Sequence, residues 1–247
     1  MPPALLKAIY IPVLLALSAA SCAGPPDYAA ERDALVKQIE RQVDATRHEL
    51  GTERLDPAII AAMRAVPRHE FVPARLLSEA YANHPLPIGA GQTISQPYIV
   101  AIMSHLLGVG PGDKVYELGT GSGYQAAVLG EMGVEVYSVE IVPELAERAQ
   151  EILQQLGYQN VKVRAGDGYL GWPEAAPFDA IIVTAAADHV PQPLIDQLAP
   201  DGRLVMPVGE TTGVQQLVVM TKTAAGTLER KDLLPVRFVP VTGPSVK

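Results

Sequence analysis

The second half of the chain alternates short apolar runs with longer segments in which apolar residues recur at helical spacing. The apolar runs predict five strands, at residues 114–118, 135–140, 161–164, 178–184 and 203–208, and two closing strands at residues 215–222 and 228–239. The segments between the first five predict helices at residues 124–132, 143–156 and 192–198. The run from Ala180 to Val183 is apolar throughout, which is typical of a strand covered on both faces. This alternation predicts an α/β fold with a doubly wound, mostly parallel sheet and helices on both faces.

The residues before this core predict a helical extension. Apolar residues at four-residue spacing (Leu35, Ile39 and Val43) predict an amphipathic helix within residues 28–50. An Asp-Pro pair at residues 56–57 predicts a short helix that ends near residue 65, because these residue types favour a cap and a first helical turn. Prolines and glycines make residues 68–94 a predicted long structured loop. A further helix is expected from Pro97, with an apolar face of Ile99, Ile102, Met103 and Leu106.

Residues 1–22 have the order of a secretory signal. Lys7 is the only charged residue, an apolar run follows, and small residues precede Cys22. These small residues resemble a bacterial lipoprotein cleavage site, although Ala19 stands where that site usually has leucine. The alternatives are a mis-assigned start codon and an uncleaved apolar tail. We therefore divide the chain into a signal-type segment (residues 1–22), a helical and loop region (residues 27–107) and a core (residues 108–247).

Charge and cysteine content exclude several classes of function. The chain has 19 Lys and Arg against 27 Asp and Glu, a net charge of −8, which disfavours binding to nucleic-acid phosphates. Cys22 is the only cysteine, so the core has neither a cysteine nucleophile nor a cysteine cluster for zinc. The histidines show no metal-ligand spacing, and we expect no metal.

A glycine-rich turn follows the first predicted strand of the core. Glycines at 119, 121 and 123 lead from the strand into a helix, the position at which doubly wound sheets bind ligands. The dinucleotide-binding fingerprint requires a glycine at position 124, where this chain has Tyr124. The observed spacing, with Glu117 inside the strand, is instead the pattern of S-adenosylmethionine-dependent methyltransferases.

Acidic residues end the next two strands. A carboxylate at Glu140 could accept hydrogen bonds from both ribose hydroxyls, and Asp167 could accept one from an adenine amino group, with Gly168 leaving room for the ring. On its own, each has a simpler interpretation, as a solvated charge at a strand end or an ordinary turn. The predicted cofactor-binding residues are Glu117, Gly119, Thr120, Gly121, Ser122, Gly123, Glu140, Ile141, Asp167 and Gly168.

The segment after the fourth strand limits which chemical groups can be the methyl acceptor. Methylation of adenine or glutamine amino groups typically uses an Asn/Asp-Pro-Pro-aromatic motif there, and residues 183–187 (Val-Thr-Ala-Ala-Ala) lack it. A carboxylate acceptor makes fewer demands. It is already anionic at neutral pH, so it needs orientation and desolvation more than a general base.

Several sequence blocks together resemble the protein-L-isoaspartate O-methyltransferase family. They are VPRHEFVP (66–73), GQTISQP (91–97), residues 117–125, VRAGDG (163–168), FDAI (178–181) and LPVRFVP (234–240). The TISQP stretch is quite specific to that family. The resemblance spans roughly residues 54–243, so the segment from residue 1 to about 50 lies outside it.

The resemblance implies a Rossmann-like methyltransferase fold and a protein-repair activity. The family methylates the α-carboxyl of L-isoaspartyl residues, or the side-chain carboxyl of D-aspartyl residues, in damaged proteins. S-adenosylmethionine is the donor and S-adenosylhomocysteine the product. Ser95 stands at the family's active-site serine, and Gln92, Thr93 and Ile94 would line the same loop. Ser95 could equally be a helix cap two residues before Pro97.

Three alternative functions stay open at this point: a small-molecule carboxyl methyltransferase, an NAD-dependent oxidoreductase, and a non-catalytic envelope lipoprotein that retains the fold. The family and the supply of the cofactor favour a cytoplasmic protein. We expect a monomer whose partners are damaged proteins and not nucleic acid. The segment before Cys22 favours export, or membrane anchoring through Cys22.

Overall fold

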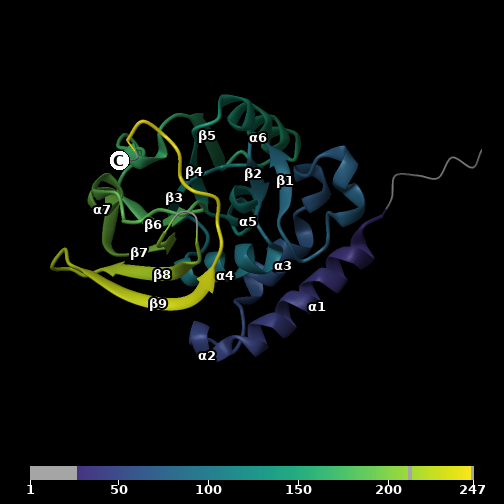
Figure 1. Ribbon diagram of the computed structural model, residues 1–247, viewed down its shortest axis with the longest axis horizontal. Coiled ribbons are helices and arrows are strands. Elements are labelled where there is room, and N and C mark those ends of the chain that lie inside the picture. Colours follow the sequence, from purple (N-terminus) through teal and green to yellow (C-terminus); the bar gives the residue numbers. More distant parts are fainter. Residues whose placement is uncertain (1–26, 211–212, 246–247) are drawn as a thin grey trace, which may run out of the picture.

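A seven-stranded sheet forms the core of the computed structural model, which describes residues 27–210 and 213–245. Its strand order is β5-β4-β3-β6-β7-β8-β9 (Figure 1). The strands β3 to β7 pair in parallel, and β8 and β9 close the sheet in antiparallel fashion. Their bounds are β3 Lys114–Leu118, β4 Glu135–Glu140, β5 Val161–Ala165, β6 Phe178–Val183, β7 Leu198–Val208, β8 Gln215–Lys222 and β9 Leu228–Val236.

Both faces of the sheet are buried at its central strands, as the apolar runs predict. In β6, Ala180 and Ile182 belong to one hydrophobic cluster, whereas Ile181 and Val183 belong to another on the opposite face. The first cluster includes side chains of the helices α4 (Pro97–Leu107), α5 (Tyr124–Glu131) and α6 (Pro143–Gln155). The second includes those of α7 (Gln192–Gln197) and of the short 3-10 helix η3 (Gly168–Leu170). The predicted fold class is confirmed.

The N-terminal region adds a helical layer outside this sandwich. The helix α1 (Ala29–Ala45) contacts α3 (Pro57–Ala65) and α4 along one side of the molecule (Figure 1). The predicted apolar face of α1 is buried. All but a few side chains of α4 are buried as well, because α4 lies between α1, α3 and the sheet. The helix predicted within residues 28–50 is divided: Thr46 leaves helical geometry, with φ −110° and ψ 13°, before α2 (Arg47–Leu50).

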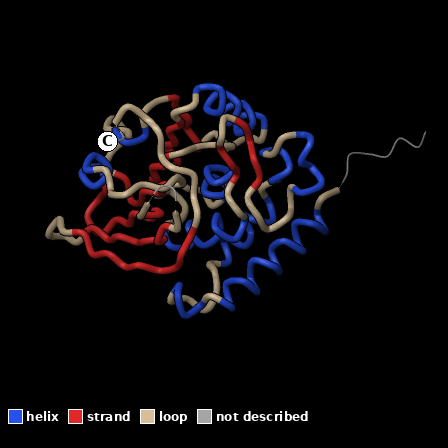
Figure 2. Tube along the Cα trace, viewed as in Figure 1, coloured by secondary structure: helices blue, strands red, loops and turns tan. Residues whose placement is uncertain are grey.

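The predicted loop at residues 68–94 contains more regular structure than the sequence indicates. Two 3-10 helices, η1 (Arg68–Phe71) and η2 (Ala74–Glu79), precede a hairpin of β1 (Leu86–Gly89) and β2 (Gln92–Ile94). Figure 2 shows this hairpin apart from the main sheet. Its strands are only four and three residues long, which is too short for a period-two pattern to stand out from its proline and glycine neighbours.

Two strand boundaries differ from the prediction by three residues or more. The strand β7 begins at Leu198 rather than at residue 203, and β9 ends at Val236 rather than at residue 239. After Val236 the chain leaves β8 and crosses to the end of β6, where the backbone of Ala186 bonds to Val239 and Val241. In residues 27–210 and 213–245, the helices are all too short or too polar to cross a bilayer. The predicted signal-type segment lies outside the described residues.

Candidate active site

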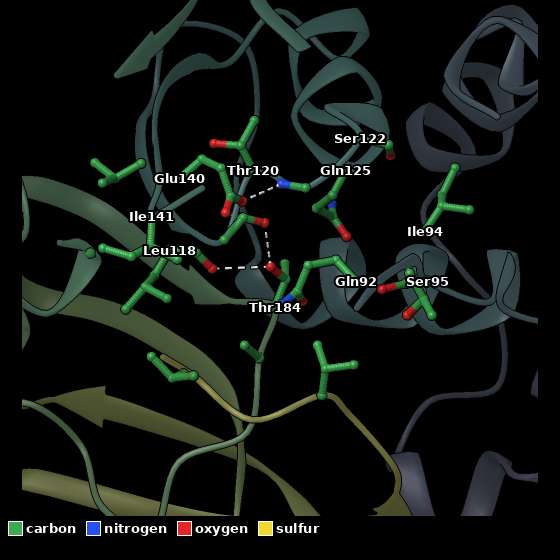
Figure 3. A pocket seen from close by; sticks show the side chains of 18 of the residues that line it. Gln92, Ile94, Ser95, Leu118, Thr120, Ser122, Gln125, Glu140, Ile141 and Thr184 are labelled. Carbon is green, nitrogen blue, oxygen red and sulfur yellow. Dashed lines mark hydrogen bonds between the residues drawn. The ribbon is translucent and has the colours of Figure 1, made fainter. Parts of the chain in front are cut away.

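The main candidate site lies where the strand order reverses. From β3 the chain builds the sheet outward through β4 and β5, then returns to the other side of β3 with β6. Ligands of doubly wound sheets bind at this switch point, beyond the carboxyl ends of the strands. A cavity opens there, with Glu140 and Ile141 on one side, Gln92 and Ser95 on the other, and Thr184 between them (Figure 3).

Most of the predicted site residues line this one cavity. From the glycine loop and the strand ends it includes Gly119, Thr120, Gly121, Ser122, Glu140, Ile141 and Gly168, and from the predicted acceptor loop Gln92, Thr93, Ile94 and Ser95. Segments as far apart as residues 92 and 184 therefore meet at one surface. The structure brings the two halves of the predicted site together.

The glycine loop has a requirement for glycine at its first position. Gly119 has φ +97°, and a Cβ there would lie 2.5 Å from the Thr184 hydroxyl. That hydroxyl is 2.6 Å from the Gly119 carbonyl oxygen and 3.0 Å from that of Leu118, so it joins the end of β6 to the loop after β3. Any larger residue at 119 would separate these two strand ends.

The carboxylate of Glu140 binds the backbone of the glycine loop. Its Oε2 accepts a hydrogen bond from the Gly121 amide at 2.7 Å, and its Oε1 accepts one from the Val142 amide at 3.0 Å. A carboxylate oxygen can accept more than one hydrogen bond, so both oxygens keep acceptor capacity for a ligand hydroxyl. The side chain is 4% exposed and lines the cavity, as the predicted ribose contact requires.

Glu117 lies beneath the cavity floor rather than in its lining. Its Oε2 accepts a hydrogen bond from Ser138 at 2.5 Å, and the Ser138 hydroxyl also contacts the Thr120 hydroxyl at 2.5 Å. Its Oε1 has no hydrogen-bond partner among the described residues. Burial raises the pKa of Glu117 to about 8, a shift that the bond from Ser138 opposes. Ser138 and Thr120 connect the acid to the cavity, because Thr120 is one of the lining residues.

Gly123 and Asp167 are also absent from the cavity lining. Gly123 precedes α5 with φ +87°, and a Cβ there would lie 3.3 Å from both Ala149 and Leu153 of α6, so its role is in packing. The Asp167 carboxylate accepts hydrogen bonds from the backbone amides of Tyr169 and Ser245, each at 3.0 Å. It thereby fixes the C-terminal segment beside the cavity. The adenine contact of Asp167 stays a prediction.

Ser95 is not the cap of α4. The N-cap residue is Gln96, and the Tyr98 amide in the first turn is bound by the side chain of Asn83 at 3.0 Å. The interpretation of Ser95 as a helix cap is therefore wrong. The backbone carbonyl of Ser95 instead accepts a hydrogen bond from Arg68 at 2.9 Å, while Ser95 itself lines the cavity opposite the glycine loop.

A second, broader cavity of about 540 Å³ shares Thr93, Ser95, Thr184 and Val239 with the first. Its remaining walls come from the end of α1, α2, Pro85, the start of α4 and residues 234–238. Polar side chains at its edge include Glu49 and Arg237. The shared residues make it a continuation of the first cavity on the side of Ser95.

Several lining residues were not predicted from the sequence as members of the site. Thr184, Gln125 and the segment from Val239 to Thr242 all line the first cavity. Thr184 follows a parallel strand next to β3, so the rule that ligands bind at strand carboxyl ends could have identified it. For the C-terminal segment the strand pattern gives no such signal, because the crossover after β9 brings it there; its pointer was the family resemblance of residues 234–240. Among the described residues, His, Cys, Asp and Glu form no group of three or more that could hold a metal.

A family model and curated relatives of this chain carry the name of the same enzyme family. The model of the protein-L-isoaspartate(D-aspartate) O-methyltransferase family matches residues 41–245. The chain belongs to this family. A relative from Syntrophobacter fumaroxidans, protein-L-isoaspartate O-methyltransferase 2, is 53% identical over 238 residues, which are 96% of both chains. The protein-L-isoaspartate O-methyltransferase of Gloeobacter violaceus is 62% identical over 185 residues, 75% of this chain and 90% of that one.

Solved structures of family members share the fold. One protein-L-isoaspartate O-methyltransferase structure matches with a TM-score of 0.76 and 30% identity, over 86% of this chain and 66% of that chain. A Plasmodium falciparum structure described as a protein of this family, in complex with S-adenosyl-L-homocysteine, matches with a TM-score of 0.71 and 26% identity, over 85% of this chain and 98% of that one. The predicted family resemblance is confirmed.

Proposed function

We propose that this protein is a repair methyltransferase that moves a methyl group from S-adenosylmethionine to the free carboxyl of L-isoaspartyl and D-aspartyl residues in damaged proteins. The observation that carries the proposal is that Ser95 and the glycine loop line the same cavity. Membership of the family and the names of its curated relatives support the same activity.

The residues of the first cavity fit the proposed cofactor. When bound, S-adenosylmethionine supplies a methyl group on a positively charged sulfonium. Gly121 offers backbone without a side chain in the cavity lining, and Glu140 offers acceptor positions for ribose hydroxyls. Glu117 lies outside the cavity lining, and its Oε1 has no hydrogen-bond partner among the described residues.

Ser95 would orient the acceptor rather than attack anything. An isoaspartyl carboxylate is ionised at neutral pH and needs no base, so a hydroxyl that donates one hydrogen bond can direct the other oxygen at the methyl carbon. The buried side chains of Ile94 and Val100 line the cavity beside Ser95 and exclude water from the reacting atoms. The resulting methyl ester closes spontaneously to a succinimide, which hydrolyses partly to normal aspartate.

The second cavity favours a polypeptide acceptor over a small acid. It continues from Ser95 away from the glycine loop, between α1, α4 and residues 234–238. A small carboxylic acid would leave this space unfilled, whereas a peptide could place the residues that flank its isoaspartyl site there. Glu49 and Arg237 at the edge would contact such flanking residues.

The test compares acceptors that differ only in the position of the carboxyl. The purified protein is incubated with methyl-tritiated S-adenosylmethionine and either an isoaspartyl peptide, its aspartyl twin, or a panel of free carboxylic acids. We expect label on the isoaspartyl peptide alone. Equal labelling of both peptides, or preferred labelling of free acids, would contradict the proposed acceptor. A folded protein that labels nothing would favour the non-catalytic binding module.

We propose further that the protein works as a cytoplasmic monomer, where its methyl donor is made. The sequence before Cys22 supports the alternative of export or lipid anchoring through Cys22. Cell fractionation with mass spectrometry of the mature N-terminus distinguishes these cases. An intact Met1 in the soluble fraction is expected, and a lipid on Cys22 would overturn the cytoplasmic assignment. Light scattering of the purified protein measures its molar mass in solution, which should be that of one chain.

A further inference from the structure

A buried arginine lies directly behind the acceptor side of the cavity. Arg68 of η1 is 0% exposed, and its Nη2 donates a hydrogen bond to the carbonyl of Ser95 at 2.9 Å. Its Nε donates to the carbonyl of Ala80 at 3.0 Å. The guanidinium lies over the ring of Tyr124, 4.7 Å from the ring centroid. Both Ser95 and Tyr124 line the cavity, so the cation is separated from it only by the residues that form its wall.

This cation has no matching anion in the described part of the chain. The ion pairs of the described residues do not include Arg68, and its Nη1 has no hydrogen-bond partner among them. Burial lowers the pKa of Arg68 to about 10, so the guanidinium stays charged at neutral pH. Two carbonyl oxygens and an aromatic face offset only part of the cost of removing such a charge from water. A carboxylate bound at Ser95 would supply the missing negative charge.

We infer that Arg68 is a positioning residue whose buried charge attracts the acceptor carboxylate to Ser95. The inference rests on the proposed function and adds the residue that makes the site selective for an anionic acceptor. It assigns the charge to the acceptor rather than to the carboxylate of the cofactor, because Arg68 bonds directly to Ser95, which also lines the second cavity. The side chain thereby fixes the backbone of the acceptor loop and sets its electrostatic potential.

The test compares two ligands that differ in one charge. One is the isoaspartyl peptide, and the other is the same peptide with that α-carboxyl converted to an amide. Binding of each is measured by calorimetry to the full-length protein saturated with S-adenosylhomocysteine, for the wild type and for Arg68→Met and Arg68→Lys. Arg64→Met serves as the matched control, since Arg64 is an arginine at the surface, paired with Asp33.

We expect the wild type to prefer the acid over the amide and Arg68→Met to lose roughly ten- to a hundredfold of that preference, as a charge pair on either side of Ser95 in a partly desolvated site implies. Arg68→Lys should keep most of the preference, and Arg64→Met all of it. Equal weakening of acid and amide would show a merely structural role and overturn the inference. A loss confined to S-adenosylhomocysteine binding would assign the charge to the cofactor and also overturn it.

A measurement on the wild type covers the case in which Arg68→Met fails to fold. The isoaspartyl α-carboxyl is labelled with carbon-13 and titrated by NMR in the complex. We expect its pKa to fall below that of the free peptide, because a nearby cation favours the ionised form. A raised pKa would overturn the inference. Methylation of the same peptide by the wild type is measured in parallel, so a failure of the proposed function is recognised separately.

Discussion

At the scale of single residues, the site depends on side chains whose neighbours leave them little freedom. Arg68 fixes the backbone of Ser95. The side chain of Asn83 caps the first turn of α4, so the Ser95 hydroxyl is not needed to begin that helix. The Thr184 hydroxyl fills the space that a Cβ at Gly119 would occupy. Substitutions at Ser95 and Gly119 can therefore distinguish effects on turnover from effects on cofactor binding and on stability.

Replacing Ser95 by alanine should lower kcat/KM for an isoaspartyl peptide by about a hundredfold, since one hydrogen bond to a charged acceptor is lost. Binding of S-adenosylhomocysteine, measured by calorimetry, should change less than about twofold. Ser78→Ala is the matched control, because Ser78 is an exposed serine in η2. Parallel loss of turnover and cofactor binding would mean that Ser95 supports the fold of the cavity instead.

Gly119→Ala should abolish measurable cofactor binding and lower the free energy of unfolding by about 1–3 kcal/mol. The added Cβ would meet the Thr184 hydroxyl at 2.5 Å, and alanine rarely adopts φ +97°. Gly226→Ala provides a comparison. It has a similar φ of +81°, but no atom lies within 4 Å of its added Cβ, so it should lose stability without losing cofactor binding. Intact binding in Gly119→Ala would contradict the proposed role of the loop.

At the scale of elements, sequence reasoning succeeded where a pattern repeats and failed where long-range contacts decide. The central strand β6 contains the apolar run from Ala180 to Val183, and the buried face of α1 follows from its spacing. The β1–β2 hairpin is too short for any periodicity, and α4 is buried nearly all round because α1 and α3 cover its outer side. Arginine is usually exposed, so the burial of Arg68 could come only from the folded arrangement.

The cap of α3 offers a test of an element away from the chemistry. The Asp56 Oδ1 accepts a hydrogen bond from the Ala58 amide at 2.8 Å, as the Asp-Pro pair predicts. Asp56→Ala should lower the free energy of unfolding by about 1 kcal/mol, measured by urea denaturation, with kcat/KM unchanged. Glu53→Ala, an exposed substitution in the same loop, should change neither. A large loss of activity in Asp56→Ala would show that α3 affects the site.

At the scale of the whole molecule, the fold explains why two distant sequence motifs form one site. The strand order places β3 between β4 and β6, so the glycine loop, Glu140 and Thr184 emerge at the same edge. The sequence predicted this edge, because alternating strands and helices imply it. The family resemblance also suggested that residues 235–240 cover the site, with an edge strand as the alternative. In the structure the segment after β9 crosses back to β6, and Val239 and Pro240 line the cavity.

The buried Glu117 makes the stability of the whole fold depend on pH. Its pKa is raised by burial to about 8 from 4.5, so the folded state keeps a proton that the unfolded state releases. Its contribution is fully present below pH 4.5 and is lost as pH rises towards 8, by at most about 1.4 kcal/mol per pH unit. The isosteric Glu117→Gln cannot titrate. Its free energy of unfolding relative to wild type should therefore rise across this range.

Urea denaturation at several pH values, without added cofactor, measures that difference. Subtracting the two proteins removes the titration of all other groups, including His69 and His105, whose pKa values are lowered chiefly by burial. A difference that does not change between pH 5 and 8 would show that Glu117 has an ordinary pKa in the folded protein.

The most direct test of the central claim, that one cavity joins a methyl donor to a misplaced backbone carboxyl, follows the repair itself. An isoaspartyl peptide is incubated with the protein and S-adenosylmethionine, and its products are separated by chromatography and identified by mass. We predict a succinimide and then the normal aspartyl peptide, both dependent on the cofactor. An isoaspartyl peptide that persists unchanged, while the protein binds the cofactor, would contradict the account.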